Sequence, residues 1–253
     1  MLPKFRDWFN WVGGYSLMAL IALLIVVIGT WGFIELTEEV SEGDTHQFDR
    51  TIMEYVGVHR GPKWLEEVGR DLTALGGVAV LSLMTLGVAG FLLSTRKFHA
   101  MWLVLIATFG GLLISTGLKW IVDRDRPDVF EHRSHVYTQS FPSGHSMLSA
   151  VVYLTLGSLL TRLVPGYKQK LYLLGVALFL TFLVGVSRVY MGVHWPTDVL
   201  AGWTAGLVWA IICWLGARAL QRRGTVEKDT EQTEDLPAAQ RGFEVESQRS
   251  TPS

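Results

Sequence analysis

The chain has 253 residues, of which 49% are hydrophobic and 18% are charged, and its formal net charge at pH 7 is −1. Soluble domains usually carry about 25% charged residues, so this composition, with a mean hydropathy of +0.30, favours a membrane protein over a soluble one. The near-zero net charge argues against nucleic-acid binding, which requires a basic field. The single cysteine, Cys213, excludes both an intramolecular disulfide and a cysteine-based zinc site.

Six stretches are apolar enough, at about 20 residues each, to cross a bilayer as helices. In chain order they run near residues 15–36, 73–93, 100–122, 144–164, 170–187 and 197–217. The first is too long for a secretory signal and is not followed closely by a small-residue cleavage pattern, so we interpret it as a retained anchor. Gly-rich stretches such as FGGLLISTG favour close helix–helix contact in lipid. The sequence therefore predicts an all-α, polytopic membrane protein with six transmembrane helices in a bundle.

Charged residues divide the connections between these spans into two kinds. One kind is basic and nearly free of acidic residues, and contains Lys4, Arg6, Arg96, Lys97, Arg162, Lys168, Lys170, Arg218, Arg222 and Arg223. The first connection on the opposite side is acidic, with Glu35, Glu38, Glu39, Glu42, Asp44 and Asp49. By the positive-inside rule we expect both termini in the cytoplasm, the protein in the cell (inner or plasma) membrane, and three connections facing outward.

The first outward connection, 37–72, has the short apolar spacing of small helices. Ile52, Met53 and Val56 form one such group, and a second begins at Trp64. Short helices lying in the membrane interface and a packed lid over the bundle both fit this pattern. Residues 224–253 are polar and low in aromatics, which predicts a disordered cytoplasmic tail. We therefore expect one six-span membrane domain, residues 1–223, followed by this tail.

Candidate functional residues gather at the outward ends of the later spans. The third span ends in LKWIVDRDRP, where Lys119 and Arg126 are seven residues, or two helical turns, apart. A continuing helix would place both cations on one face, roughly 10 Å apart. Pro127 disfavours helical geometry at the residue before it, so the helix is expected to unwind near there.

Two further stretches complete the set of candidates. FPSGH opens the fourth span with Ser143, Gly144 and His145, and SRVYMGVHWPTD joins the last two spans with Arg188, His194 and Asp198. Taken singly, each residue has an ordinary structural explanation, because cations at span ends reach head groups, Pro and Gly cap helices, and acidic residues complement a helix dipole. Those explanations do not account for three cations, two histidines and a carboxylate at one predicted surface.

Such a set of side chains suits a phosphoryl group. Three cations can clamp a multiply charged anion. Ser143 and Gly144 open a helix whose backbone N–H groups offer an anion seat. Asp198, four residues after His194, can hold one ring N–H and leave the other nitrogen unprotonated and nucleophilic. His145 can then protonate a leaving oxygen.

With these motifs the sequence resembles the type 2 phosphatidic acid phosphatase family, integral-membrane lipid phosphatases related in active-site design to vanadium haloperoxidases. The family pattern reads KxxxxxxRP, PSGH and SRxxxxxHxxxD. The matching residues are Lys119, Arg126, Pro127, Pro142, Ser143, Gly144, His145, Ser187, Arg188, His194 and Asp198. The resemblance spans residues 119–198, and the six-span layout extends it over most of the chain.

The resemblance implies a role for each matching residue. His194 is expected to attack phosphorus and become a phosphohistidine that water hydrolyses, with Asp198 as its orienting partner and His145 as the general acid. Lys119, Arg126, Arg188, Ser143 and Gly144 are expected to bind the phosphoryl oxygens. The family needs no metal, so no cofactor is expected, and the three cations replace the charge neutralisation that magnesium gives elsewhere. The implied activity is metal-independent hydrolysis of a lipid phosphate within the bilayer, and no obligate protein partner is indicated.

Two other classes of function stay open from the sequence. Asp123, Asp125 and Asp128 in DRDRPD could bind magnesium, although the interleaved arginines would compete for the carboxylates. His132 and His135 could form a metal pair, but no further ligand is evident. A transporter would carry its charges deep within the spans, whereas these lie at span ends.

The motifs do not choose among lipid substrates. The family includes enzymes for undecaprenyl pyrophosphate, phosphatidylglycerophosphate, phosphatidic acid and diacylglycerol pyrophosphate, and transfer of the phosphoryl group to another lipid is a related reaction. We expect residues 37–72 and 128–140 to shape the selectivity.

Overall fold

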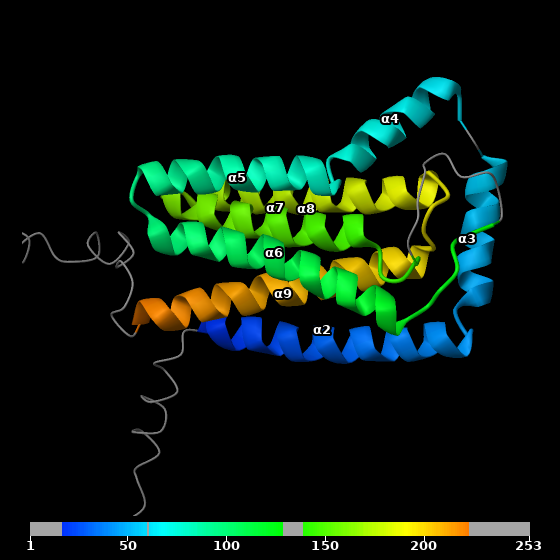
Figure 1. Cartoon of the computed structure of the whole chain (residues 1–253), viewed down its shortest axis with the longest axis horizontal. Helices are drawn as coiled ribbons and strands as arrows, with labels where there is room; N and C mark the ends of the chain where they lie inside the picture. The colour runs from blue at the N-terminus through cyan, green and yellow to red at the C-terminus, as the bar shows by residue number, and fades with distance from the viewer. Residues whose placement is uncertain (1–16, 60, 129–138, 223–253) are drawn as a thin grey trace, which may run out of the picture. The chain divides into compact units, whose positions relative to one another are not determined.

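The computed structural model describes residues 17–59, 61–128 and 139–222, and the regular structure in these ranges is helical throughout (Figure 1). In chain order the helices are α2 (Leu17–Glu42), α3 (His46–Val58), α4 (Lys63–Ala74), α5 (Val78–Ser94), α6 (Phe98–Ile121), α7 (Gly144–Leu160), the 3-10 turn η1 (Thr161–Leu163), α8 (Tyr167–Tyr190) and α9 (Pro196–Arg222). The predicted all-α fold is confirmed.

Five helical segments are long and apolar enough to cross a membrane: α2, α6, α7 with η1, α8 and α9. A sixth span arises if α4 and α5 are counted together, since they form a pair bent by 45°. The predicted second span, 73–93, is interrupted in the structure, because the chain turns at Gly76 and Gly77 and α5 begins only at Val78. At 17 residues α5 is about 25 Å long, shorter than the hydrocarbon core of a bilayer, so it qualifies as a span by length only together with α4.

The predicted connection 37–72 contains two short helices, α3 and α4, as its spacing indicated. Their predicted place in the membrane interface stays a prediction. Figure 1 shows α3 running across one end of the bundle, at a large angle to the long helices. The first span extends beyond its predicted end, because α2 continues to Glu42 through a run of glutamates that favour helix.

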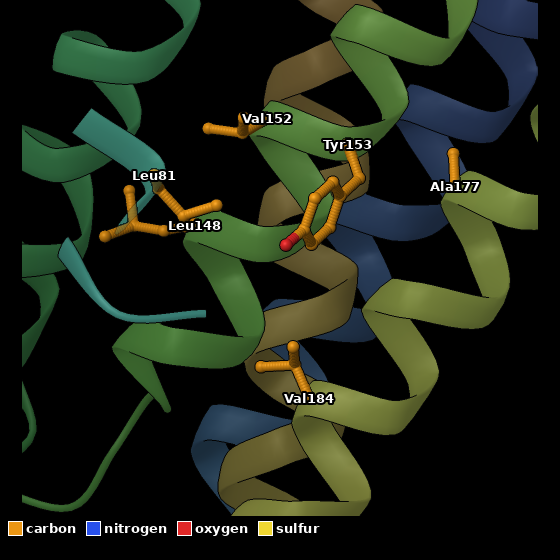
Figure 2. Close-up of a cluster of buried hydrophobic side chains, with 6 residues drawn as sticks. All are labelled: Leu81, Leu148, Val152, Tyr153, Ala177 and Val184. Carbon is orange, nitrogen blue, oxygen red and sulfur yellow. The ribbon is translucent and has the colours of Figure 1, made fainter. Parts of the chain in front are cut away.

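Helix α7 forms the centre of the bundle and packs against α5, α6 and α8. Its side chains Leu148, Val152 and Tyr153 meet Leu81 of α5 and Val184 of α8 in a buried cluster, shown with Ala177 in Figure 2. The Tyr153 hydroxyl donates to the carbonyl oxygen of Leu75 at 2.8 Å, which satisfies its polar end. Large apolar side chains on α2 and α8 are mostly exposed, as lipid-facing surfaces require.

Small residues allow α9 to approach α7 closely. A Cβ at Gly202 would lie 2.6 Å from the carbonyl oxygen of Ser143, and one at Gly206 would lie 2.5 Å from that of Met147. Because Gly202 and Gly206 are four residues apart, they share a face of α9. This contact places the first turn of α9, with Asp198, beside the start of α7.

Contacts divide the chain into two units, Met1–Ala217 and Arg218–Ser253. The first unit holds the helical bundle, and residues 218–222 of the second continue α9. The tail predicted for 224–253 lies outside the described residues, so its disorder and the boundary at 223 stay predictions.

Candidate active site

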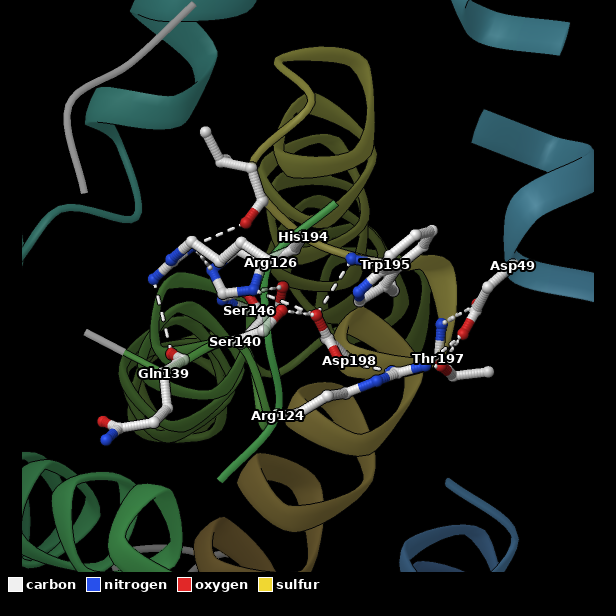
Figure 3. Close-up of polar contacts among 12 residues, drawn as sticks. Asp49, Arg124, Arg126, Gln139, Ser140, Ser146, His194, Trp195, Thr197 and Asp198 are labelled. Carbon is white, nitrogen blue, oxygen red and sulfur yellow. Dashed lines mark hydrogen bonds and ion pairs between the residues drawn. The ribbon is translucent and has the colours of Figure 1, made fainter. Parts of the chain in front are cut away.

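The three motifs meet at the end of the bundle where α7 and α9 begin and α6 and α8 end (Figure 3). Lys119 lies in the last turn of α6, Arg188 in the last turn of α8 and Asp198 in the first turn of α9. His145 is the second residue of α7. The side chains that interact electrostatically with it are Lys119, Arg126, Arg188 and His194. The structure therefore brings the cations and imidazoles of the three motifs together.

His194 and Asp198 form a buried pair, at 2% and 0% exposure. The imidazole Nδ1 lies 3.3 Å from Oδ2 of Asp198. An ionised carboxylate only accepts hydrogen bonds, so Nδ1 carries the proton and Nε2 is left with its lone pair. The four-residue spacing brings the two side chains together because α9 begins between them, at Pro196. Proline is well tolerated at the first position of a helix.

Asp198 is also held by donors other than the imidazole. The backbone N–H of Trp195 donates to Oδ2 at 2.9 Å, as expected for an acidic residue three positions after a helix cap. The Ser140 hydroxyl donates to the same oxygen, and Arg124 Nη1 donates to Oδ1 at 2.7 Å. A buried carboxylate is costly unless donors surround it, and these contacts meet that requirement.

Burial determines the protonation state of His194. Removal from solvent lowers the pKa of its imidazole below the ordinary histidine value, and the hydrogen bond and charge of Asp198 oppose this only in part. The nearby positive charges of Arg188 and Arg126 lower the pKa further. The imidazole is therefore neutral at pH 7, the state that a nucleophile requires.

Arg126 lies beside the unprotonated nitrogen of His194. Its Nη1 donates to the carbonyl oxygen of Val193 at 2.5 Å and lies 3.4 Å from Nε2 of His194, while Nη2 is 3.4 Å from the carbonyl oxygen of Gln139. Burial lowers the pKa of its guanidinium, against the effect of Asp198, but arginine stays charged at any ordinary pH.

Lys119 on α6 contacts the Gln139 carbonyl oxygen as well, since its Nζ donates to that oxygen at 2.7 Å. The two cations thus converge, but not along one helical face. The helix does not continue from Lys119 to Arg126, because α6 ends at Ile121 and Val122 is extended. The hydrogen bond of the Arg124 N–H to the Val122 carbonyl turns the chain there, earlier than the predicted unwinding near Pro127.

Ser143 is the N-cap of α7, and its hydroxyl accepts from the N–H and hydroxyl of Ser146 at 3.5 and 2.9 Å. The predicted helix start is confirmed, but Ser143 is completely buried and its own N–H donates to the Asp198 carbonyl at 2.9 Å. The next N–H groups, of Gly144 and His145, begin the helix and have no acceptor within it, and anion binding at this helix start stays a prediction. A Cβ at Gly144 would lie 3.7 Å from Cε of Lys119, so this backbone runs beside a cation.

Arg188 is 2% exposed, and its Nε is buried with no hydrogen-bond partner among the described residues. An orphaned guanidinium donor in the interior is unfavourable unless an anion completes it. The neighbouring Ser187 hydroxyl donates to the Val184 carbonyl and lies 2.7 Å from the Thr73 hydroxyl, which ties the end of α8 to α4. His145 packs against the turn between α4 and α5, where a Cβ at Gly77 would lie 3.9 Å from its Nε2.

A second set of buried polar residues lies behind Asp198, and the sequence motifs do not single it out. In the sequence pattern Arg124 stands only as a competitor for a metal, and Asp49 only as a charge of an acidic connection. The structure places Arg124 between Asp49 and Asp198, with Thr197 and Ser140 nearby. Arg124 lies inside the first motif stretch, which could have drawn attention to it, whereas nothing local distinguishes Asp49 from the glutamates before it.

Within the described ranges, no group of three or more His, Cys, Asp and Glu side chains is arranged to hold a metal ion. The carboxylates of DRDRPD do not gather into such a group. His132 and His135 lie outside the described residues.

Comparisons with known proteins show which family this chain resembles in sequence and fold. A sequence model of the PAP2 superfamily matches residues 99–222. Phosphatidylglycerophosphatase B of Bacillus subtilis is 34% identical over 180 residues, 70% of this chain and 86% of that protein. Lipid A 1-phosphatase of Rhizobium etli is 30% identical over 175 residues, 60% of this chain and 71% of that protein.

A solved structure has the same fold. The crystal structure of a transmembrane PAP2 type phosphatidylglycerolphosphate phosphatase from Bacillus subtilis matches 78% of this chain and 96% of its own, with a TM-score of 0.71 and 31% identity. The matches thus cover between 71% and 96% of the length of these relatives. The chain belongs to the PAP2 superfamily, as one of its multi-pass membrane phosphatases.

Proposed function

We propose that this protein hydrolyses the phosphomonoester or pyrophosphate head group of a membrane lipid through a phosphohistidine on His194. The observation that carries the proposal is the pairing of Asp198 with Nδ1, which leaves Nε2 of a neutral, buried imidazole unprotonated, with its lone pair toward the Arg126 guanidinium at 3.4 Å. The orphaned Nε of Arg188 supports an anion in the same place. The relatives named above act, by their names, on lipids that carry phosphate.

The reaction runs in two balanced steps. In the first, the Nε2 lone pair of His194 forms a bond to phosphorus while the bond to the leaving oxygen breaks, and His145 gives that oxygen a proton. Asp198 stabilises the imidazolium charge that develops. In the second, water attacks phosphorus as the N–P bond breaks, and His145 takes the proton from water.

The cations act on the transferred group. Lys119, Arg126 and Arg188 bind the phosphoryl oxygens and neutralise charge that grows in the transition state, together with the N–H groups at Gly144 and His145. Three fixed positive charges make a metal ion unnecessary, so we propose metal-independent catalysis. In the same proposal both termini are cytoplasmic, and the site opens at the extracytoplasmic leaflet of the cell membrane, where it meets a lipid phosphate at head-group depth.

Purified protein assayed on a panel of lipids tests the proposal. Undecaprenyl pyrophosphate, phosphatidylglycerophosphate, phosphatidic acid and diacylglycerol pyrophosphate are compared, and released phosphate is measured separately from phosphate transferred to another lipid. His194→Ala is expected to lower kcat by about 10²–10⁴-fold or more while the helical content is kept. EDTA is expected to leave the wild-type rate unchanged.

The matched control is His99→Ala, since His99 is exposed at the start of α6. Near wild-type turnover by His194→Ala would rule out the nucleophile, and activity restored only by added magnesium would rule out metal independence. Phosphate delivered mainly to a second lipid would identify the phosphotransferase alternative, which uses the same site.

A further inference from the structure

Arg124 links two buried carboxylates from distant parts of the chain. Its Nη1 donates to Oδ1 of Asp198 at 2.7 Å, and its Nη2 donates to Oδ2 of Asp49 at 2.6 Å. The Arg124 side chain is 9% exposed, and the two carboxylates are 0% and 1% exposed. A guanidinium can serve two acceptors at once in fixed geometry, which an ammonium group cannot reproduce.

Arg124 is itself held in place by its surroundings. Its guanidinium carbon lies 5.6 Å from the centre of the Trp195 ring, and the indole N–H donates to the Asp125 carbonyl at 3.0 Å. Its Nη1 also donates to the Thr197 hydroxyl at 2.8 Å. Packing on both the ring and the hydroxyl leaves the guanidinium a single orientation.

Asp49 connects this assembly to α3. Its Oδ1 accepts the backbone N–H of Thr197 at 3.0 Å, and its Oδ2 accepts the Thr197 hydroxyl at 2.5 Å. Thr197 is the second residue of α9, so Asp49 caps that helix from another element, where negative charge is favourable. Helix α3 therefore supports the start of α9 without reaching the side of the site that would hold a phosphoryl group.

The two oxygens of Asp198 have separate partners. Oδ2 faces His194, whereas Oδ1 faces Arg124. In Figure 3 Arg124 lies with Thr197 and Asp49 on one side of Asp198, and Arg126 lies on the side of His194. Rotation of the carboxylate would break the Arg124 contact, so that contact, together with the Ser140 and Trp195 donors on Oδ2, fixes the plane in which Oδ2 meets the imidazole.

We propose that Arg124 is a positioning residue for the reaction: it locks the carboxylate of Asp198, and through it the imidazole of His194, and Asp49 of α3 completes the lock. This inference rests on the proposed function, in which His194 is the nucleophile. Part of the connection 37–72 then supports the nucleophile from behind.

Steady-state kinetics of purified variants test this role. For Arg124→Gln, kcat is expected to fall about 10–100-fold, a range typical for partners that orient a functional ligand, while KM changes little because Arg124 does not contact substrate. Arg124→Lys is expected to recover only part of the loss, since one ammonium cannot hold both carboxylates in fork geometry. Asp49→Asn is expected to lower kcat less than Arg124→Gln does.

The matched control is Arg50→Gln on the same helix as Asp49. Arg50 forms an exposed ion pair with Glu54 at 2.9 Å, so its replacement is expected to leave kcat and KM unchanged. Thermal unfolding of each variant shows which ones are folded. If Arg124→Gln does not fold, the kcat and KM of Arg124→Lys and Asp49→Asn test the proposal instead.

A double-mutant cycle separates positioning from general stability. In an Asp198→Asn background, Arg124→Gln is expected to cost less than about 3-fold, because the carboxylate that it orients is already gone. Full kcat in a folded Arg124→Gln protein, a raised KM with unchanged kcat, or losses that multiply in the double variant would each overturn the inference. His194→Ala in the same assay tests the proposed function independently: if it stays active, that function fails whatever Arg124 does.

Discussion

Asp198 receives more of the described side-chain hydrogen bonds of the site than any other residue drawn in Figure 3. Its donors are the imidazole of His194, the hydroxyl of Ser140, the N–H of Trp195 and the guanidinium of Arg124. Because three donors converge on Oδ2 while Arg124 donates to Oδ1, the carboxylate is held in one orientation, and that orientation determines which imidazole nitrogen is unprotonated. The tautomer of His194 is therefore set by its neighbour Asp198.

The lowered pKa of His194 predicts how stability depends on pH. In the unfolded chain this histidine takes up a proton near its ordinary pKa of about 6.5, whereas the folded protein keeps it neutral. The unfolded state therefore binds more protons below that pH, so the folded state loses stability as pH falls through about 6.5 and loses nothing above it. At pH 5.5 the loss from this residue is about 1 kcal/mol.

Thermal unfolding in detergent measures this effect. The unfolding temperature of wild type is expected to fall between pH 7.5 and 5.5 by more than that of His194→Gln, which has no titrating group there. His99→Gln, at an exposed histidine, is expected to follow wild type. An equal fall in wild type and His194→Gln would contradict a neutral buried imidazole.

The contact between α7 and α9 connects packing to the site. Gly202 and Gly206 bring the two helices close enough for the Ser143 N–H to reach the Asp198 carbonyl at 2.9 Å. The cap of one helix and the first turn of the other thus become one structural unit. Helix packing through small residues, which often serves only stability in membranes, here also sets the geometry of candidate catalytic groups.

Gly202→Ala is expected to disturb that unit. Its Cβ would lie 2.6 Å from the Ser143 carbonyl, so one of the two helices must shift, at a cost of about 1–3 kcal/mol, and kcat should fall with it. Gly216→Ala on the same helix is the control, because nothing lies within 4 Å of the added carbon. Unfolding temperature and turnover of both variants check the prediction. A Gly202→Ala protein as stable and active as the control would show that the helices tolerate a wider spacing.

For the chain as a whole, the charge asymmetry of the connections predicts an orientation in the membrane. The basic residues Arg96 and Lys97 join α5 to α6, at the opposite end of these helices from Lys119. The positive-inside rule places this connection in the cytoplasm and α3 outside.

Cysteine labelling in intact cells tests the orientation. The only native cysteine, Cys213, is buried and can be replaced by serine. In that background a cysteine in place of exposed His59, at the end of α3, is expected to react with a membrane-impermeant reagent. One in place of exposed Lys97 should react only after the cells are opened. The reverse pattern would invert the proposed topology and place the site on the cytoplasmic side.

The sequence by itself determined the all-helical fold, the approximate spans and the family. Hydropathy indicates the apolar segments directly, since each must match the thickness of the bilayer. Motif spacing indicates residues that can meet because they are about one helical turn apart, such as His194 and Asp198. Spacing also predicted the helix start at Gly144, because capping is a local property of the chain.

Only the tertiary structure decided what depends on contacts between distant segments. The break at Gly76 and Gly77, the early end of α6 and the use of the Ser143 N–H by Asp198 follow from packing between helices, which a linear pattern does not encode. Asp49 and Arg124 are 75 residues apart in sequence, and Asp49 and Thr197 are 148 apart. Their charges are visible in the sequence, but the burial and pairing on which their proposed support of His194 rests exist only once the helices have packed together.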